Sequence, residues 1–503
     1  MAIRVRYPPS PTGLQHIGGL RTALFNYLFA RSSGGSFILR IEDTDRERFD
    51  PRALNDIYET FEWIGFKWDE GPDVGGDYGP YVQSERSELY REHARALLES
   101  GLAYEAFDSA ESLRAEREAA EDGGIRKGYD RKFRDMSETE KERYRDQGIA
   151  PVIRFKVPLE GTTEFEDLLL GRVKRKNRDV IPDPVLLKSD GMPTYHLANV
   201  VDDHLMEISH ILRGQEWVPT ASLHVLLYRA FGWDPPMFCH LPMVMGNDGQ
   251  KLSKRHGATS VQEFRKQGYL PEALINYLAR LGWSYDDQRE FFTLQELREL
   301  FDPAKLTKSP AVFDYRKLDW FNGAYIRERP PAEVRELIRP FLVEAGLISD
   351  PPTAEETRIL EDAVPLVHER LKRLSDVSHL LRFVFAPVDS WDPAMLVPKK
   401  MSPADVPALL KRARALLEGF EQRPDEEIEN RFREAAEADG IKLGSLLMPL
   451  RVAVTGSTAS PPLFASLKLL GAEETFQRID RCLEFVEQLP AGDNRREDTE
   501  TKE

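Results

Sequence analysis

The first sixty residues show an ordered change of hydrophobic periodicity. Apolar residues alternate with arginines over 3–7, which is the period of a strand. From His16 the apolar positions recur at helical spacing, and Gly34-Gly35 supplies a left-handed stop before a second apolar run, 36–41. Strand, helix and strand of these lengths predict a right-handed βαβ unit whose ligand lies beyond the carboxyl ends of the strands. The polar residues predicted around that crevice are Arg6, Ser10, His16 and Glu42.

Between residues 87 and 187 the pattern is different. Charged helical stretches are followed by short strand-like runs, such as 152–157 and 184–187. Apolar periodicity then returns over 195–231, and 237–245 has the composition of another buried strand. This order predicts an α/β fold, a Rossmann-like doubly wound parallel sheet that is split by an α+β insertion.

The second half of the chain has helical period almost throughout. Proline-rich breaks near residues 330, 351, 387 and 398 mark module edges after Ser260. A chain of 503 residues is too long for one ordinary core. We therefore expect an all-α C-terminal half. Residues 491–503 are almost wholly polar or charged, and we expect a disordered tail because they bury too little apolar surface.

Composition excludes several classes of protein. The formal net charge of −16 argues against a chain that coats nucleic acid indiscriminately, so a nucleic-acid partner must meet local basic patches. Cys239 and Cys482 lack neighbours at zinc-site spacing, so we expect no metal site from cysteine or histidine, no structural zinc, and two buried thiols. No apolar run approaches the roughly 20 residues that span a bilayer. We expect a soluble, cytoplasmic protein without a membrane partner.

Two segments have residue types that bind phosphate. Residues 9–19 are small and precede a helix N-terminus, whose N–H groups and partial positive charge attract anions, and His16 adds a donor. The run Lys251-Leu252-Ser253-Lys254-Arg255 is basic and lies between glycines. Each has a plainer interpretation, a turn with a capping histidine and a solvated basic surface. Their pairing at one edge of the predicted sheet favours nucleotide activation, and no P-loop motif is present.

The chain resembles the class I aminoacyl-tRNA synthetases in both segments. His16-Ile17-Gly18-Gly19 is similar to their first signature, and residues 251–255 are similar to their second. The specific resemblance is to the glutamyl-tRNA synthetases of bacterial type. It is carried by longer motifs at residues 23–28, 40–45, 79–86, 195–204, 313–314 and 320–323.

This resemblance implies a glutamate-tRNA ligase that uses ATP and yields AMP and pyrophosphate. L-Glutamate would be activated to glutamyl adenylate and transferred to the 3′-terminal adenosine of tRNA(Glu). Mg²⁺ would accompany ATP, and the transfer RNA would bind before activation proceeds. The protein would be a monomer.

The resemblance also implies a glutamate site. Arg213 is the informative position, because related glutaminyl enzymes lack an arginine there and a buried cation facing a neutral amide stays unpaired. An ordinary salt bridge to Glu216 is the alternative for Arg213. Tyr195 and Asn199 are four residues apart and share a helical face, which a packing role also explains. The implied glutamate-binding residues are Arg6, Ser10, Glu42, Tyr195, Asn199 and Arg213.

The nucleotide site follows from the two signatures. The catalytic residues would be His16, Lys251 and Lys254, which stabilise charge on phosphoryl oxygens without covalent catalysis. Trp217 is interpreted as a core aromatic, and Asp43 and Asp45 as structural. The implied ATP-binding residues are Ser10, Thr12, His16, Gly18, Lys251, Ser253, Lys254 and Arg255.

The remaining segments would bind the transfer RNA. Arg370 and Arg451 match family positions that meet the anticodon, although a solvated helix arginine is the alternative for each. The expected domains are the first catalytic half (1–86), the acceptor-end insertion (87–194), the second catalytic half (195–259), a stem-contact helical domain (260–329), two anticodon-binding subdomains (330–388 and 389–490) and the tail (491–503).

Three other functions fit parts of the chain. A catalytically silent RNA-binding relative is disfavoured by retention of His16, Lys251 and Lys254. A short enzyme that glutamylates a modified base is disfavoured by the long helical half. A glutaminyl-tRNA synthetase is disfavoured by Arg213 and by the same half. Discrimination between the glutamate and glutamine transfer RNAs stays open, with Arg370 leaning toward discrimination.

Overall fold

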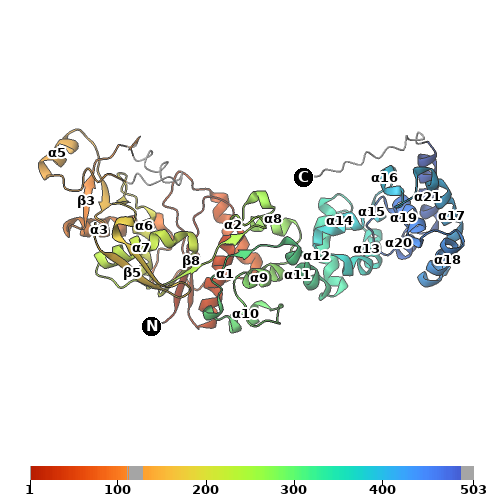
Figure 1. Ribbon diagram of the computed structural model, residues 1–503, viewed down its shortest axis with the longest axis horizontal. Coiled ribbons are helices and arrows are strands. Elements are labelled where there is room, and N and C mark those ends of the chain that lie inside the picture. The colour runs from red at the N-terminus through yellow and green to blue at the C-terminus, as the bar shows by residue number, and fades with distance from the viewer. Residues whose placement is uncertain (1, 110, 113–128, 489–503) are drawn as a thin grey trace. The chain divides into compact units, whose positions relative to one another are not determined.

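The computed structural model describes residues 2–109, 111–112 and 129–488, and they form two compact units (Figure 1). The N-terminal unit contains Met1–Arg265 and Pro271–Leu318, and the C-terminal unit contains Lys266–Leu270 and Asp319–Glu503. The expected tail, 491–503, lies outside the described residues. No described helix is long and apolar enough to cross a membrane.

The chain begins with the predicted strand, helix and strand. β1 (Arg4–Tyr7) pairs in parallel with β2 (Ser36–Leu39), and α1 (Ile17–Ser32) connects them. His16 is the N-cap of α1, and its Nδ1 accepts a hydrogen bond from the Gly18 N–H. Gly34 has a φ of +63°, the left-handed conformation that favours glycine after a helix end. The hydrophobic period therefore predicted this unit correctly.

A second group of strands continues the α/β layer. β8 (His210–Gly214) pairs in parallel with β9 (Met237–Leu241), within the order β6-β5-β9-β8 that also includes β5 (Thr162–Asp167) and β6 (Gly171–Lys176). The loop before β8 runs beside β1, since the Ser209 N–H donates to the Arg4 carbonyl over 3.0 Å. Helices α6 (Tyr195–Leu205) and α7 (Val218–Ala230) pack in the same layer. The predicted fold class is confirmed.

The α+β insertion has its own small sheet. β3 (Ala103–Ala106), β4 (Val152–Phe155) and β7 (Val185–Leu187) form an antiparallel sheet in that order, so the strands expected at 152–157 and 184–187 are confirmed. Helices α3 (Ser87–Glu99) and α5 (Glu138–Asp146) belong to the same segment.

The single strand expected over 237–245 is wrong. β9 ends at Leu241, and a separate strand β10 (Val244–Met245) pairs with β11 (Ala311–Val312). Pro242 breaks the run because it has no N–H to donate to a ladder. Its carbonyl instead accepts a hydrogen bond from Arg21 Nη1 over 2.7 Å, and Arg21 Nε donates to the Leu281 carbonyl over 2.5 Å.

The remaining elements are helical, as the pattern after Ser260 predicts. No strand occurs among the described residues of the C-terminal unit. Both cysteines are buried, Cys482 in the helical core of this unit. The longer helices are α2 (Pro51–Ile64), α8 (Val261–Lys266), α9 (Pro271–Arg280), α10 (Leu294–Leu300), α11 (Tyr315–Arg327), α12 (Pro331–Glu344), α13 (Ala354–Val367), α17 (Val406–Leu416), α18 (Asp425–Ala438), α19 (Leu443–Thr455), α20 (Leu463–Leu470) and α21 (Ala472–Glu487), with the one-turn helices α14 (Val377–Leu380), α15 (Arg382–Phe385) and α16 (Pro393–Leu396) between them.

Candidate active site

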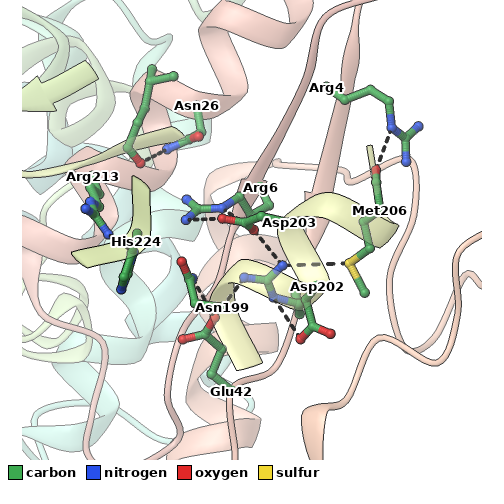
Figure 2. Close-up of polar contacts among 12 residues, drawn as sticks. Arg4, Arg6, Asn26, Glu42, Asn199, Asp202, Asp203, Met206, Arg213 and His224 are labelled. Atoms are coloured by element: carbon green, nitrogen blue, oxygen red, sulfur yellow. Dashed lines mark hydrogen bonds and ion pairs between the residues drawn. The ribbon is translucent and has the colours of Figure 1, made fainter. Parts of the chain in front are cut away.

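A buried network of charges lies where β1, β2 and α6 meet. Arg6 donates to both oxygens of Asp203 over 3.0 and 3.1 Å (Figure 2). Arg40 donates to Asp203 over 2.7 Å and to Glu42 over 2.9 Å. Arg6 therefore does not lie on a solvated face of an alternating strand. It is 1% exposed, and its charge is paired inside. The whole network contains Arg6, Arg40, Arg86, Glu42, Asp202 and Asp203.

Burial and the neighbouring arginines shift the pKa values of two carboxylates of this network in opposite directions. Burial alone would raise the pKa of Asp203, but Arg6 and Arg40 lower it below the usual value of an aspartate. Burial raises the pKa of Glu42, against the opposing effect of Arg40. Three cations and three carboxylates balance, so the network as it stands has no net charge with which to attract an ion.

Several buried side-chain atoms of this region have no hydrogen-bond partner, among them Arg40 Nε and Gln83 Oε1. Asn199 Nδ2 donates to Glu42 Oε1 over 3.3 Å, which fixes the orientation of the amide and leaves the buried Oδ1 without a donor. Arg6 Nη1 is likewise buried with no acceptor. Unsatisfied buried groups are costly and mark the place of an unseen polar partner.

Arg213 is a buried cation whose partners are all neutral. Its Nε donates to His240 Nε2 over 3.1 Å, and Nη1 lies 3.3 Å from His224 Nδ1 and 3.4 Å from the Tyr195 hydroxyl. Within the part of the chain that the structure describes, Arg213 makes no ion pair, so the alternative salt bridge to Glu216 is wrong. Glu216 instead lies 3.9 Å from Lys251. Burial lowers the pKa of Arg213, because the charged form is disfavoured away from water.

Trp217 is not a core aromatic. Its side chain is 37% exposed, and its ring lies 4.7 Å from that of Tyr195 between centroids. The carbonyl of Trp217 is 3.4 Å from Arg213 Nη2. This tryptophan follows a glycine and two polar residues at the end of β8, a position at the rim of the site rather than in the sheet.

A pocket of about 300 Å³ opens at the N-terminus of α1, and His16, Gly18 and Lys251 line it. Because His16 Nδ1 accepts from the Gly18 N–H over 3.0 Å, the proton of the neutral ring is on Nε2, which is left as a donor. Burial and the nearby Lys251 charge lower the pKa of His16. The capping and the donor interpretations of His16 are thus compatible.

The other predicted nucleotide residues lie outside this pocket. Ser10 and Thr12 are exposed in the loop before α1, and Lys254 and Arg255 are exposed in a short 3-10 turn. Ser253, half-buried, contacts His256 in the same turn, and Arg255 pairs with Asp248 over 3.1 Å. Of the segment 251–255, the pocket therefore brings Lys251 and Leu252 together with the first signature, and Lys251 is the one cation among the two.

The two predicted anticodon residues meet within the C-terminal unit. Arg370 Nη1 lies 3.4 Å from the Ser460 carbonyl, and Arg451 Nη1 donates to the Ser460 hydroxyl and, over 2.9 Å, to the Pro461 carbonyl. Arg451 is half-buried in these contacts, whereas Arg370 is exposed and a solvated arginine stays the alternative for it. Burial lowers the pKa of Arg451, and the charge of Arg370 adds to that effect.

Sequence reasoning missed several residues of the site. Asp202 and Asp203 directly follow the mainly apolar helical run 197–201, and two adjacent acids in such a helix were a signal of buried partners. His240 stands in the apolar strand β9 and contacts Arg213 across the ladder. His224 gave no comparable signal.

Comparisons with known proteins bear on both units. The family described as tRNA synthetases class I (E and Q), catalytic domain, matches residues 2–320, and the anticodon binding domain family matches residues 333–483. The glutamate–tRNA ligases of Borreliella burgdorferi and Treponema denticola are 53% and 49% identical, over 97% and 96% of this chain and 99% of each relative.

Solved structures give the same result. The crystal structure of a glutamate tRNA ligase from Elizabethkingia meningosepticum in complex with its amino acid has a TM-score of 0.77 and 36% identity, covering 97% of this chain and 100% of that one. The sequence, the two matched domains and the fold agree, and the chain belongs to the glutamate–tRNA ligase family of class I tRNA synthetases.

Proposed function

We propose that the chain activates L-glutamate with ATP and transfers it to the 3′-terminal adenosine of tRNA(Glu). The observation that carries this proposal is the set of unsatisfied groups in the buried site. Arg6 has an unpartnered donor nitrogen, Asn199 an unpartnered acceptor oxygen, and Arg213 a cation with neutral partners. Glutamate offers two carboxylates and one ammonium, so each kind of group finds its complement.

The roles within the amino-acid site follow from charge. Arg213, Arg6 and the Tyr195 hydroxyl bind the side-chain carboxylate, since arginine donates parallel hydrogen bonds that fit a carboxylate. Glu42 faces the ammonium, with Asn199 Oδ1 as a second acceptor and Ser10 assisting from the loop. Glutamine would leave the Arg213 charge without a counter-charge, which disfavours it.

The nucleotide occupies the pocket at the N-terminus of α1. The His16 Nε2–H, the helix N-terminus and Lys251 stabilise charge on the phosphoryl oxygens. Lys254 completes this set from the 3-10 turn, with Ser10, Thr12, Gly18, Ser253 and Arg255 around the nucleotide. Among the described residues no three His, Cys, Asp or Glu side chains converge as a metal group. Mg²⁺ would therefore be held by the phosphate oxygens and water, as it often is beside nucleotides.

The chemistry then needs no covalent enzyme intermediate. The α-carboxylate of glutamate attacks the α-phosphorus of ATP, pyrophosphate leaves, and glutamyl adenylate remains. A 2′-hydroxyl of the terminal adenosine attacks the activated carbonyl, and AMP leaves. The proposed tRNA contacts are the insertion for the acceptor end, 260–329 for the stem, and Arg370 and Arg451 for the anticodon, in a monomer without structural zinc.

Amino-acid-dependent exchange of pyrophosphate into ATP tests this proposal. We expect exchange with glutamate and not with glutamine, and exchange that requires the transfer RNA. The Lys254→Ala variant should lose exchange yet bind tRNA with near-normal affinity. Exchange that runs equally with glutamine, or normal exchange in Lys254→Ala, would overturn the corresponding assignment. Charging purified glutamate and glutamine transfer RNAs side by side then determines whether the enzyme discriminates between them.

A further inference from the structure

The histidine partners of Arg213 belong to a connected chain of hydrogen-bonded side chains that runs from the Asp167 carboxylate to His196. Asp167 Oδ2 lies 2.6 Å from His240 Nδ1, and His240 Nε2 accepts from Arg213 Nε. On the other side, Arg213 Nη1 lies 3.3 Å from His224 Nδ1, and His224 Nε2 lies 3.1 Å from His196 Nδ1. Figure 2 shows the Arg213 guanidinium beside the His224 ring.

Asp167 at one end of this chain and Arg213 in its middle determine which histidine nitrogens carry hydrogens. A carboxylate only accepts, so His240 Nδ1 carries the hydrogen and Nε2 is a bare acceptor. Arg213 only donates, so His224 Nδ1 is bare and Nε2 carries the hydrogen that His196 Nδ1 accepts. Each ring is thereby a neutral tautomer, and each presents a lone pair on the side that faces Arg213.

Burial keeps these rings neutral. His224 and His240 are fully buried. Burial, the Arg213 charge and His196 all lower the pKa of His224 well below the usual value. Burial and the Arg213 charge also lower the pKa of His240, against the opposing effect of Asp167. Asp167 itself is held by the N–H groups of Leu169 and Leu170 over 2.9 and 2.8 Å, so the far end of the chain is anchored to backbone.

We propose that His224 and His240 are positioning residues that give Arg213 its specificity, because they orient the guanidinium with neutral acceptors and leave its charge for the carboxylate of the substrate. A carboxylate in either place would orient Arg213 equally well but would neutralise it. This inference rests on the proposed function, in which Arg213 binds the side chain of glutamate. Arg6 offers a comparison within the same site, because its guanidinium is held by the carboxylate of Asp203.

The test is a matched pair of variants, His224→Asn and His224→Asp. Both side chains reach about as far as Nδ1, and they differ in charge alone. In tRNA-supported pyrophosphate exchange, we expect His224→Asn to keep its KM for glutamate within about fivefold of the parent. We expect His224→Asp to raise that KM at least about 50-fold and to lower the preference for glutamate over glutamine at least about tenfold, with the KM for ATP unchanged in both. If His224 only filled space, the two variants would have the same KM for glutamate.

The control pair is His210→Asn and His210→Asp. His210 lies on β8 three residues from Arg213, and its Nδ1 contacts Ser209. We expect no difference between these two variants in the KM for glutamate. A second pair of variants, His240→Gln and His240→Phe, tests the proposal if His224→Asp does not fold. His240→Gln keeps an acceptor near Nε2 and should bind glutamate at least about tenfold better than His240→Phe.

The outcomes separate the two proposals. If the parent protein shows no glutamate-dependent exchange, the proposed function fails. If the parent is active but His224→Asp binds glutamate as His224→Asn does, or His240→Phe as His240→Gln does, the positioning role is refuted.

Discussion

Replacement of Asp203 by asparagine should destabilise the N-terminal unit by about 3–5 kcal/mol, the usual cost of removing one partner from a buried ion pair. Asp203 accepts hydrogen bonds of 3.0, 3.1 and 2.7 Å from two arginines that are at most 1% exposed. Each charge-assisted bond contributes about 1.5–3 kcal/mol. Asparagine keeps one acceptor oxygen, so part of this set survives, but the network is left with one uncompensated positive charge.

Native-state hydrogen exchange of the amides in β1 and α6 measures this loss locally, and it does not require the two units to unfold together. The matched control is Glu164→Gln, because Glu164 pairs at 2.7 Å with Arg172 and with Lys174, which are 62% and 55% exposed. An exposed pair of this kind should contribute less than about 1 kcal/mol. If Asp203→Asn opened the unit no more easily than Glu164→Gln, the account of the network as a mutually dependent set of buried charges would be refuted.

Three further predictions concern other parts of the chain. Burial and the Arg213 charge lower the pKa of His196 from 6.5 to about 4. As the pH falls, His196 is therefore protonated in the unfolded chain before it is protonated in the folded one. The free energy of unfolding should have its full value above pH 6.5 and fall by about 3 kcal/mol toward pH 4. Denaturation of His196→Asn across this range should show a smaller pH slope, and an unchanged slope would contradict the assignment. Lys251→Ala should reduce pyrophosphate exchange about 100-fold or more with little change in tRNA affinity, measured by exchange and filter binding. Arg451→Ala should raise the KM for tRNA(Glu) about tenfold, whereas Arg433→Ala, which removes an exposed pair with Glu429, should leave it unchanged.

The sequence predicted the elements better than it predicted their contacts. The period change at His16 and the stop at Gly34 follow from local rules, so the first βαβ unit could be derived without a structure. The break at Pro242 could also have been predicted, because proline has no N–H to donate to a neighbouring strand. The apolar residues on both sides of it nevertheless favoured one continuous strand.

For the candidate site, too, the sequence indicated individual residues but not the contacts between them. The βαβ pattern placed Arg6 and Glu42 near the predicted crevice, the resemblance added Asn199 and Arg213, and all four are buried in the structure. The residues that hold them could not be predicted, because Asp203 reaches Arg6 from helix α6 and His240 reaches Arg213 across the β8–β9 ladder, and both contacts join segments distant in sequence. Which charges are paired also depends on burial in the folded chain, and the hydrophobic periodicity of the sequence carries no information about those pairs. The resemblance therefore suggested the groups that we propose to bind the substrate, whereas the residues that hold those groups could be identified only from the structure.

The pairing of Arg6 with Asp203 has a consequence for the growing chain on the ribosome. The two residues are 197 positions apart, so at about 5–20 residues per second the arginine leaves the exit tunnel roughly 10–40 s before its counter-ion. Until then β1 contains an unpaired cation that opposes burial of the strand. We therefore expect burial of β1, the first strand to be translated, to follow synthesis of the insertion and of α6.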